Sequence, residues 1–247
     1  MRLFAAVLML AVFGTTGALP AAAAEKSALT DAQKDELRKF VREYLIENPE
    51  IISDAINALD TKAEKTKTDK RNAIISNRKQ ELFNPAEGTV IGNPKGDVTV
   101  VEFFDYNCGY CKAMYAAMTD LLKEDPKMRL VLKEYPILGP ASVTATKAAL
   151  AARKQGKYSE MHLALLGHKG SLTDGNIMEI AEKTGLDMRK LQNDMKDPAI
   201  TDVIVKNHNL ADELSIDGTP SLLIGDVFVP GAVSKEKLVE YIAKARK

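Results

Sequence analysis

The stretch FFDYNCGYCKAM, residues 103–114, contains both cysteines of a chain of 247 residues. An apolar run rich in β-branched and aromatic residues, 98–104, leads into it, and apolar residues at helical spacing, 113–122, follow. These patterns predict a buried strand, a turn that carries the cysteines, and then a helix. The fold and the chemistry of the chain both depend on what this Cys-x-x-Cys pair does.

Three kinds of site could use two cysteines at this spacing. A structural zinc ion needs four ligands, and the remaining soft ligands, His162, His168 and His208, are not spaced in pairs of three to five residues. We expect these histidines at the surface or at helix ends. A structural disulfide across so short a loop would stabilise the fold by only about 2 kcal/mol. A redox-active dithiol, with no metal and no further cofactor, is therefore favoured.

The position of the pair at a predicted helix start suits thiol chemistry. A cysteine there lies against unpaired N–H groups and the positive end of the helix dipole, which lower its pKa. Cys108 follows the strand and opens the helix, so we expect it to be the exposed nucleophile, with Cys111 as the shielded resolving thiol. Gly109 and Tyr110 carry no charge, so backbone and helix must lower the pKa, and the Tyr110 ring is available to a bound peptide.

The beginning of the chain has the plan of a signal peptide. Arg2 precedes an apolar run, 3–13, and small residues lead to Ala24. We expect residues 1–24 to be cleaved and the mature protein to be exported; an uncleaved anchor is the alternative, although the run is shorter than the roughly 20 residues of a membrane span. Lys+Arg and Asp+Glu both number 34, so the formal charge is zero and predicts no attraction to nucleic acid.

Residues 25–59 are predicted to form a helical segment that associates with copies of itself. Thr30 and Gln33 suggest a capping box, and Asn48-Pro49 would restart the helix as N-cap and first helical residue. The apolar positions follow helical spacing and are Leu37, Phe40, Val41, Tyr44, Leu45, Ile51, Ile52, Ile56 and Leu59. These faces predict a homo-oligomer, a dimer or a trimer; folding back onto the rest of its own chain is the alternative.

The rest of the chain divides into a polar and a mixed part. Residues 60–84 are predicted to be a polar helical stalk or linker, because Ala63 is the only hydrophobic residue between 60 and 72 and such a stretch cannot pack on a core. Residues 85–247 are predicted to be an α/β domain. Its expected elements are strand 98–104, a strand within 128–138, a helical block at about 140–214, strands 221–224 and 227–229, and a helix from Ser234.

Two motifs of this domain resemble a known family. VEFFDYNCGYCK, 101–112, resembles the active-site segment of DsbA-like proteins, and IDGTPSLLIG, 216–225, resembles their cis-proline loop and the following strand. The helical block is similar to the insertion that distinguishes these proteins from plain thioredoxin. The resemblance runs from about Phe83 to the C-terminus. It implies a thioredoxin fold with a helical insertion, thiol:disulfide oxidoreductase activity and a periplasmic location.

The resemblance also implies roles for single residues. Pro220 falls on the cis-proline, and Thr219 before it would offer backbone groups to an extended substrate. Glu102 falls on a buried acid that moves the proton of the resolving cysteine; a half-exposed carboxylate at the sheet edge is the alternative. These three residues and the two cysteines are the expected catalytic residues.

The remaining expectations concern residues around the pair. Gly109, Tyr110 and Thr219 are the expected substrate contacts. Met114 and Met118, on the same helix side as Cys111, are expected to pack in the core, with copper binding as the alternative.

Two features resemble isomerases more than oxidases. Gly-Tyr between the cysteines and Thr219 match the pattern of DsbC-type isomerases, whereas DsbA-type oxidases carry Pro-His and Val. The N-terminal segment resembles the extensions of oligomeric isomerases of the DsbC and Scs kinds. The implied partners are unfolded or misoxidised exported proteins and a DsbD-like or ScsB-like membrane reductant. A dithiol oxidase with a DsbB-like oxidant, and a non-enzymatic chaperone or surface interaction protein, are the alternatives.

Overall fold

The computed structural model describes residues 29–85 and 88–246, and the predicted signal peptide lies outside them. The chain divides into two compact units between Ala58 and Leu59. Helix α1, Asp31–Glu47, lies in the first unit, and helix α2, Glu50–Asn77, begins there.

The predicted capping box at the start of α1 is confirmed. The Thr30 hydroxyl accepts a hydrogen bond from the Gln33 N–H at 3.3 Å, and the Gln33 side chain accepts one from the Thr30 N–H at 2.9 Å. The prediction for Asn48 needs correction. Its N–H donates to the Tyr44 carbonyl, so Asn48 is the C-cap of α1, and α2 begins at Glu50, one residue after Pro49.

The apolar positions of the first unit are largely exposed. Helix α1 contains no buried residue. Large exposed hydrophobic side chains continue into the first turns of α2 and include Leu37, Phe40, Val41, Tyr44, Ile46, Ile52 and Ile56. Among the described residues of the first unit, 29–58, this surface has no partner of the kind that an amphipathic helix normally packs against.

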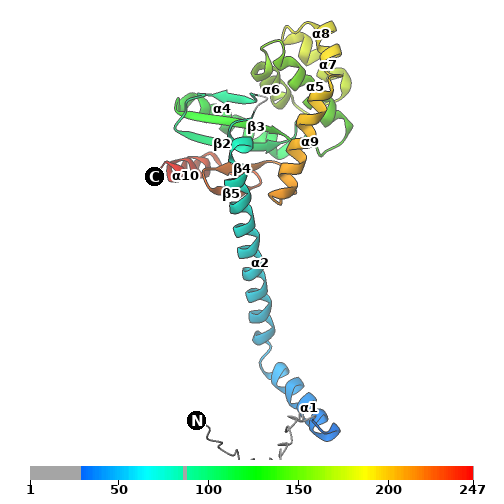
Figure 1. The fold of residues 1–247 in the computed structure, drawn as a ribbon, viewed down its shortest axis with the longest axis vertical. Coiled ribbons are helices and arrows are strands. Elements are labelled where there is room, and N and C mark those ends of the chain that lie inside the picture. Colours follow the sequence, from blue (N-terminus) through cyan, green and yellow to red (C-terminus); the bar gives the residue numbers. More distant parts are fainter. Residues whose placement is uncertain (1–28, 86–87, 247) are drawn as a thin grey trace, which may run out of the picture. The chain divides into compact units, whose positions relative to one another are not determined.

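The second unit forms a five-stranded mixed sheet over its described residues (Figure 1). The strand order is β1-β3-β2-β4-β5, in which β2 and β3 are parallel and the other neighbours antiparallel. The strands are β1 Val90–Gly92, β2 Val98–Phe104, β3 Met128–Glu134, β4 Ser221–Ile224 and β5 Val227–Pro230. The prediction of a thioredoxin fold is confirmed. Only β1 was not predicted, because three residues are too short to show an alternating pattern.

Helices connect and cover these strands. Helix α4, Gly109–Glu124, joins β2 to β3, and a helical block between β3 and β4 is the predicted insertion. The other helices are α3 Lys79–Phe83, α5 Pro140–Arg153, α6 Tyr158–Gly167, α7 Asp174–Lys183, α8 Met188–Asp194, α9 Pro198–Glu213 and α10 Lys235–Ala245. The short α8 lies within the predicted helical block but has no helical pattern of its own, since Leu191 is its one buried residue.

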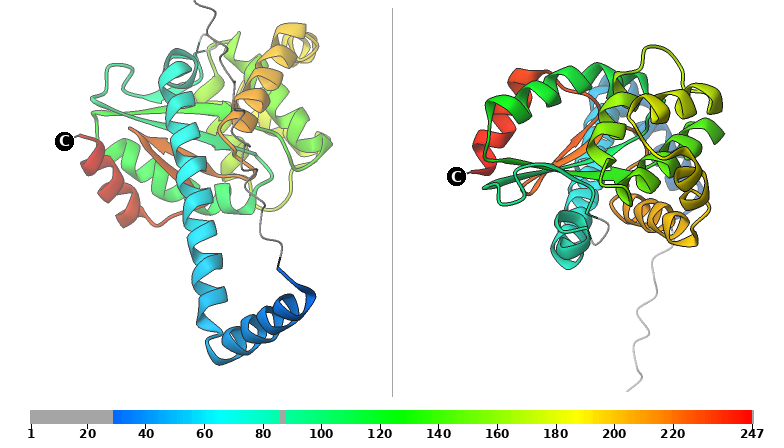
Figure 2. Two further views of the ribbon diagram at one scale, coloured as in Figure 1. Left: turned by 60° about the horizontal axis from the view of Figure 1, so that its bottom comes forward. Right: turned by 90° about the horizontal axis from the view of Figure 1, so that it is seen from above.

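The alternation of β2 decides which helices cover which face of the sheet. Val100 and Phe104 belong to the core that includes α4 and α10, whereas Val101 and Phe103 belong to the core that includes the end of α2 and α3. The views in Figure 2 show α10 and the end of α2 on opposite sides of the sheet. Glu102 shares the parity of Val100 and Phe104, so its side chain lies on the α4 side.

The end of α2 packs on the sheet through a residue of the predicted stalk. Arg71 is buried, its guanidinium lies 3.8 Å from the centroid of the Phe228 ring, and its Nε donates to the Leu214 carbonyl at 3.0 Å. The expectation that residues 60–72 make no contact with a core is therefore wrong at Arg71. A cation–π contact and a long aliphatic stem allow a charged residue to dock where a hydrophobic pattern is absent.

Among the described helices, none is long and apolar enough to cross a membrane.

Candidate active site

The two cysteines lie at the start of α4, directly beyond the end of β2. Cys108 is the N-cap residue, and its Sγ accepts a hydrogen bond from the Cys111 N–H at 3.4 Å. The Cys108 Sγ also lies 3.1 Å from the carbonyl oxygen of Thr219. The Thr219–Pro220 peptide bond is cis, as the family resemblance implies. The structure thus brings four of the predicted site residues together, with both cysteines as free thiols.

The accessibility of the pair differs from the expectation. The Cys108 residue is only 5% exposed and Cys111 1%, so Cys108 is the less buried thiol but not an exposed one. The first turn of α4 and the loop at Thr219 cover its sulfur. Tyr110, in contrast, is 73% exposed. Around the cysteine pair, the exposed group is therefore the Tyr110 ring and not the Cys108 sulfur.

The two thiols have opposite pKa shifts. The pKa of Cys108 is lowered to about 5, chiefly because the Cys111 thiol donates a hydrogen bond to it. The Thr219 side chain and the backbone N–H groups of Cys111 and Tyr110 lower it further, while burial opposes them. The expectation that backbone and helix dominate is thus corrected. The same thiol–thiol bond, burial and the charge of Glu102 raise the pKa of Cys111.

We expect the reduced protein to show one thiol that titrates near pH 5 when the rate of alkylation by iodoacetamide is measured against pH. Because the folded pKa of Cys108 lies below the value of about 8.5 in an unfolded chain, this thiolate stabilises the reduced protein fully above that value. The stabilisation declines as the pH falls and is lost below about 5, which urea unfolding at several pH values measures. Two thiols that react equally, and only above pH 8, would contradict the assignment.

Glu102 is buried beside the pair, so its position fits the buried acid and not a half-exposed edge carboxylate. Burial, and then the charge of Cys108, raise the pKa of Glu102 to about 8. Glu102 and Cys111 line a cavity of about 10 Å³, which has room for one water molecule. A carboxyl group with this pKa can accept or release a proton near neutral pH.

Met114 and Met118 are buried in the core formed by α4 and the sheet. The prediction of core packing for these two residues is confirmed.

A buried polar cluster next to the site was not predicted. The Glu134 carboxylate, at the end of β3, accepts hydrogen bonds from the hydroxyls of Tyr106, Tyr158 and Thr146, each at 2.9 Å. The Tyr106 oxygen also lies 3.1 Å from His162 Nδ1. Burial raises the pKa of Glu134 to about 8 and lowers that of His162 to about 3. The residues that bond to Glu134 come from separate elements of the fold. The one sign of this cluster in the sequence was that an acidic residue, Glu134, ends an otherwise largely apolar strand.

The histidines do not form a metal site. His162 is buried, contrary to the expectation of a surface or helix-end position. His168 is the C-cap of α6, as expected. The ring of His208 packs against the ring of Tyr135, with 4.7 Å between the ring centroids. Across residues 29–85 and 88–246, no group of three or more His, Cys, Asp or Glu side chains is placed to hold a metal ion.

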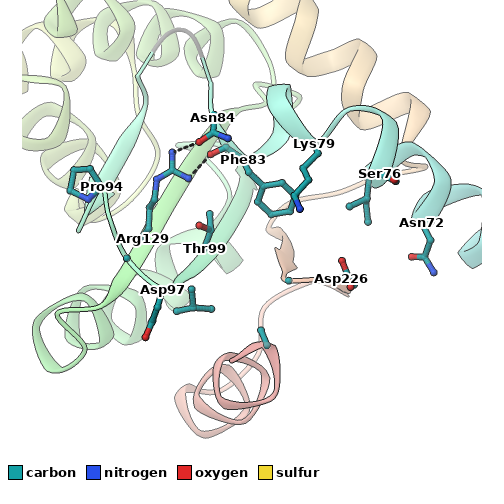
Figure 3. Close-up of a pocket in the computed structure, with 15 residues that line it drawn as sticks. Asn72, Ser76, Lys79, Phe83, Asn84, Pro94, Asp97, Thr99, Arg129 and Asp226 are labelled. Carbon is teal, nitrogen blue, oxygen red and sulfur yellow. Dashed lines mark hydrogen bonds between the residues drawn. The ribbon is translucent and has the colours of Figure 1, made fainter. Parts of the chain in front are cut away.

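A second hollow, of about 720 Å³, lies at the opposite end of β2 from the cysteines. Figure 3 shows Arg129 bonded to Asn84 and to the Phe83 carbonyl at its wall, with Thr99 nearby. Arg129 Nε is buried and has no hydrogen-bond partner among the described residues. Both cysteines lie outside the lining of this hollow.

Comparison with known families divides the chain in a similar way. The DSBA-like thioredoxin domain matches residues 99–243, and the N-terminal domain of the copper resistance protein ScsC matches residues 33–65. The chain spans 22% and 25% of the length of two curated relatives, Na⁺/H⁺ antiporters NhaA of Salinispora tropica and Salinispora arenicola. It is 32% and 30% identical to them over 143 and 164 residues.

Three solved structures are similar over most of their length. A thioredoxin-like oxidoreductase from Silicibacter pomeroyi is 47% identical with a TM-score of 0.66, and the match covers 68% of this chain and 96% of that one. The thiol-disulfide exchange protein alpha-DsbA2 of Wolbachia pipientis is 32% identical with a TM-score of 0.67, and the match covers 72% of this chain and 97% of that one. Proteus mirabilis ScsC in a transitional conformation is 30% identical with a TM-score of 0.65, and the match covers 89% of this chain and 97% of that one.

These matches agree with the geometry of the site. The matched domain contains β2, the paired cysteines at the start of α4, the helical insertion and the cis-proline loop. It covers more than half of the chain. The protein therefore belongs to the family of DSBA-like thioredoxin-domain proteins.

Proposed function

We propose that this protein is an exported thiol:disulfide oxidoreductase that reshuffles or reduces non-native disulfides in other exported proteins. One observation carries the proposal: the pKa of Cys108 is lowered to about 5 while that of Cys111 is raised. A thiolate attacks disulfides and a thiol does not, so Cys108 is ready to react at neutral pH and Cys111 is held back. The nearby cis-proline loop supports strand-like binding of a client.

The proposed reaction begins with attack of the Cys108 thiolate on one sulfur of a client disulfide. The client S–S bond breaks, its other sulfur leaves as a thiolate, and a mixed disulfide forms. A second client thiolate can then attack the mixed disulfide, which makes a new client disulfide and frees Cys108 without net electron transfer. Alternatively, Cys111 loses its proton and attacks the Cys108 sulfur of the mixed disulfide. The Cys108–Cys111 disulfide forms, the client sulfur leaves as a thiolate, and the client is reduced by two electrons while the pair is oxidised. The position and pKa of Glu102 support a role as acceptor of that proton.

Isomerase or reductase activity requires the pair to be kept reduced, so we propose a membrane thiol-redox partner that supplies electrons. Gly109 and Tyr110 support this direction, since the dipeptide between the cysteines matches the pattern of the isomerases. One observation favours a dithiol oxidase as the second candidate. Strong stabilisation of the Cys108 thiolate stabilises the reduced form, which makes the disulfide more oxidising.

Two rates separate these candidates. The reduced protein is given scrambled ribonuclease, and the oxidised protein is given a reduced dithiol peptide. The proposal expects recovery of ribonuclease activity in the first assay. Catalysis of the second reaction alone would contradict it and favour the oxidase. The reduction potential then places the pair on a scale that runs from about −270 mV for reducing to about −120 mV for oxidising members of the fold.

Replacing Thr219 with Val is expected to raise the pKa of Cys108 by about one unit, since the Thr219 side chain contributes a hydrogen bond to the thiolate. The less stable thiolate also makes the pair more reducing, by about 30 mV for a change of 1.4 kcal/mol. Alkylation against pH and equilibration with glutathione buffers measure the two quantities. Thr219→Ser, which keeps the hydroxyl, is the matched control. A Val variant with unchanged pKa and potential would remove this side chain from the mechanism.

We further propose that the first unit assembles with copies of itself into a dimer or trimer. Leu37, Val41, Leu45, Ile46 and Ile52 line an apolar hollow of about 620 Å³ within this unit. Burial of one such side chain is worth roughly 1.5–3 kcal/mol, so several buried together can exceed the cost of association. The match of residues 33–65 to the ScsC N-terminal domain agrees with the resemblance of this segment to the N-terminal extensions of oligomeric Scs-type isomerases.

A further inference from the structure

The turn between β2 and α4 contains a buried carboxylate to which the proposed mechanism gives no role. Asp105 is fully buried, and its carboxylate accepts four hydrogen bonds. The donors are the N–H of Asn107 at 2.7 Å and the Ser142 hydroxyl at 2.8 Å on Oδ1, and the N–H groups of Ile137 at 2.8 Å and Leu138 at 3.0 Å on Oδ2. A buried carboxylate is costly unless it is bonded in this way, so its retention at this position needs a reason.

The two oxygens of Asp105 hold different segments. Oδ1 bonds the N–H two residues on, which is an Asx-turn, and the Asp105 carbonyl accepts the Cys108 N–H at 3.1 Å. This side of the residue therefore fixes the turn that presents Cys108. Oδ2 bonds two successive N–H groups of the connection between β3 and α5, residues 135–139.

The two residues of the connection that Oδ2 holds, Ile137 and Leu138, are apolar and exposed. Ile137 is 37% exposed and Leu138 52% exposed. In the sheet, β3 lies on one side of β2 and β4 on the other, and Pro220 directly precedes β4. The turn at Cys108 is thus flanked by the cis-proline loop on one side and by Ile137–Leu138 on the other. Asp105 connects the turn to the second of these flanks.

We propose that Asp105 is a positioning residue that locks the Cys108 turn and the Ile137–Leu138 connection together, so that the thiolate and an apolar contact for the client keep a fixed spacing. This inference rests on the proposed thiol–disulfide exchange for its effect on clients. The anchoring itself is independent of the reaction and has its own readouts.

Asp105→Asn separates the two halves of the arrangement. The asparagine oxygen can still form the Asx-turn and accept the Ser142 hydroxyl, because Asn and Asp both make such turns. Its NH₂ group then faces the N–H groups of Ile137 and Leu138, which lose their acceptor. The loss of a hydrogen bond to a charged acceptor costs about 1.4 kcal/mol or more at each amide. Hydrogen exchange at the Ile137 and Leu138 amides should therefore be about tenfold faster, or more, than in the wild type.

The kinetic test uses two disulfides. The first is a peptide closed by one disulfide and carrying leucine side chains, and the second is the small reagent DTNB. In Asp105→Asn we expect KM for the peptide to rise about fivefold or more, for a loss of about 1 kcal/mol of binding, while kcat and the DTNB rate stay within about twofold. The pKa of Cys108 should not rise. Asp105→Ala removes both anchors, so there the pKa of Cys108 should also rise, by about one unit.

Asp125→Asn is the matched control. Asp125 makes the same kind of bond to an N–H two residues on, that of Lys127 at 3.1 Å, but lies at the far end of α4. It should leave the peptide KM and exchange at Ile137 and Leu138 unchanged. If Asp105→Asn leaves exchange and KM at wild-type values, the proposal is overturned. If Asp105→Ala does not fold, the Asn variant alone decides. A wild type without peptide activity would refute the proposed function, while exchange and the pKa would still test the anchor.

Discussion

The Cys108→Ser protein is expected to lose thiol–disulfide exchange by at least about a thousandfold, because a serine hydroxyl without an adjacent base is a poor nucleophile. The pKa of Cys108 near 5 makes it a thiolate at neutral pH, and the sequence contains one other cysteine, whose pKa is raised. Reduction of insulin, followed by its turbidity, measures the loss.

Cys111→Ser is the matched control for this experiment. It makes the same change at the other cysteine, so it should still attack clients and accumulate mixed disulfides that a non-reducing gel detects. The pair of variants also tests the alternative of a non-enzymatic chaperone. If wild type neither reduces insulin nor rescues scrambled ribonuclease, and Cys108→Ser protects clients from aggregation as well as wild type does, the enzymatic proposal is refuted.

The second large effect is expected from removal of the first unit. A chain that begins at Leu59 keeps the second unit, including Arg71 and its contact with Phe228. We expect this chain to be a monomer by light scattering and to keep the alkylation profile of Cys108. Its isomerase activity should fall by about tenfold or more, because several linked sites act on one client at a raised effective concentration and a single site does not.

Point substitutions in the full mature chain control for the deletion. Val41→Glu and Ile52→Glu each place a charge in the apolar hollow of the first unit and should dissociate an assembly held together there. Arg38→Glu, at the same hollow, changes a charge without removing apolar surface. A wild-type protein that is monomeric at micromolar concentration would contradict the assembly proposal and would favour the alternative of a monomeric oxidase.

Local patterns were enough to predict the centre of the fold and the cysteine pair. The bounds of β2 follow from a mainly apolar run rich in β-branched and aromatic residues, and the helix start at Cys108 follows from the change to helical spacing. The cis bond at Pro220 came from the family resemblance and not from residue patterns. The local pattern gave no measure of how far the Thr219 loop covers the sulfur, so the low exposure of Cys108 was not anticipated.

What the sequence did not reveal depends on contacts between distant segments. Asp105 bonds to Ile137 and Leu138, 32 and 33 residues away, and Arg71 bonds to a carbonyl 143 residues away. A polar residue in an apolar run indicates that some partner exists but not which one, because the partner is fixed only when the strands and helices are assembled. The same reason explains why His162 was expected at the surface.

The Glu134 cluster has a consequence for how this domain could be shortened or recombined. Two of the three hydroxyls on that carboxylate, from Thr146 and Tyr158, belong to the helical block, while Tyr106 belongs to the thioredoxin core. Excising the block to obtain a minimal thioredoxin would remove two of these hydrogen bonds and leave the Glu134 carboxyl with one side-chain donor. The block is therefore not an exchangeable module: a graft between relatives has to carry residue 134 with the helices, or replace it with an apolar side chain.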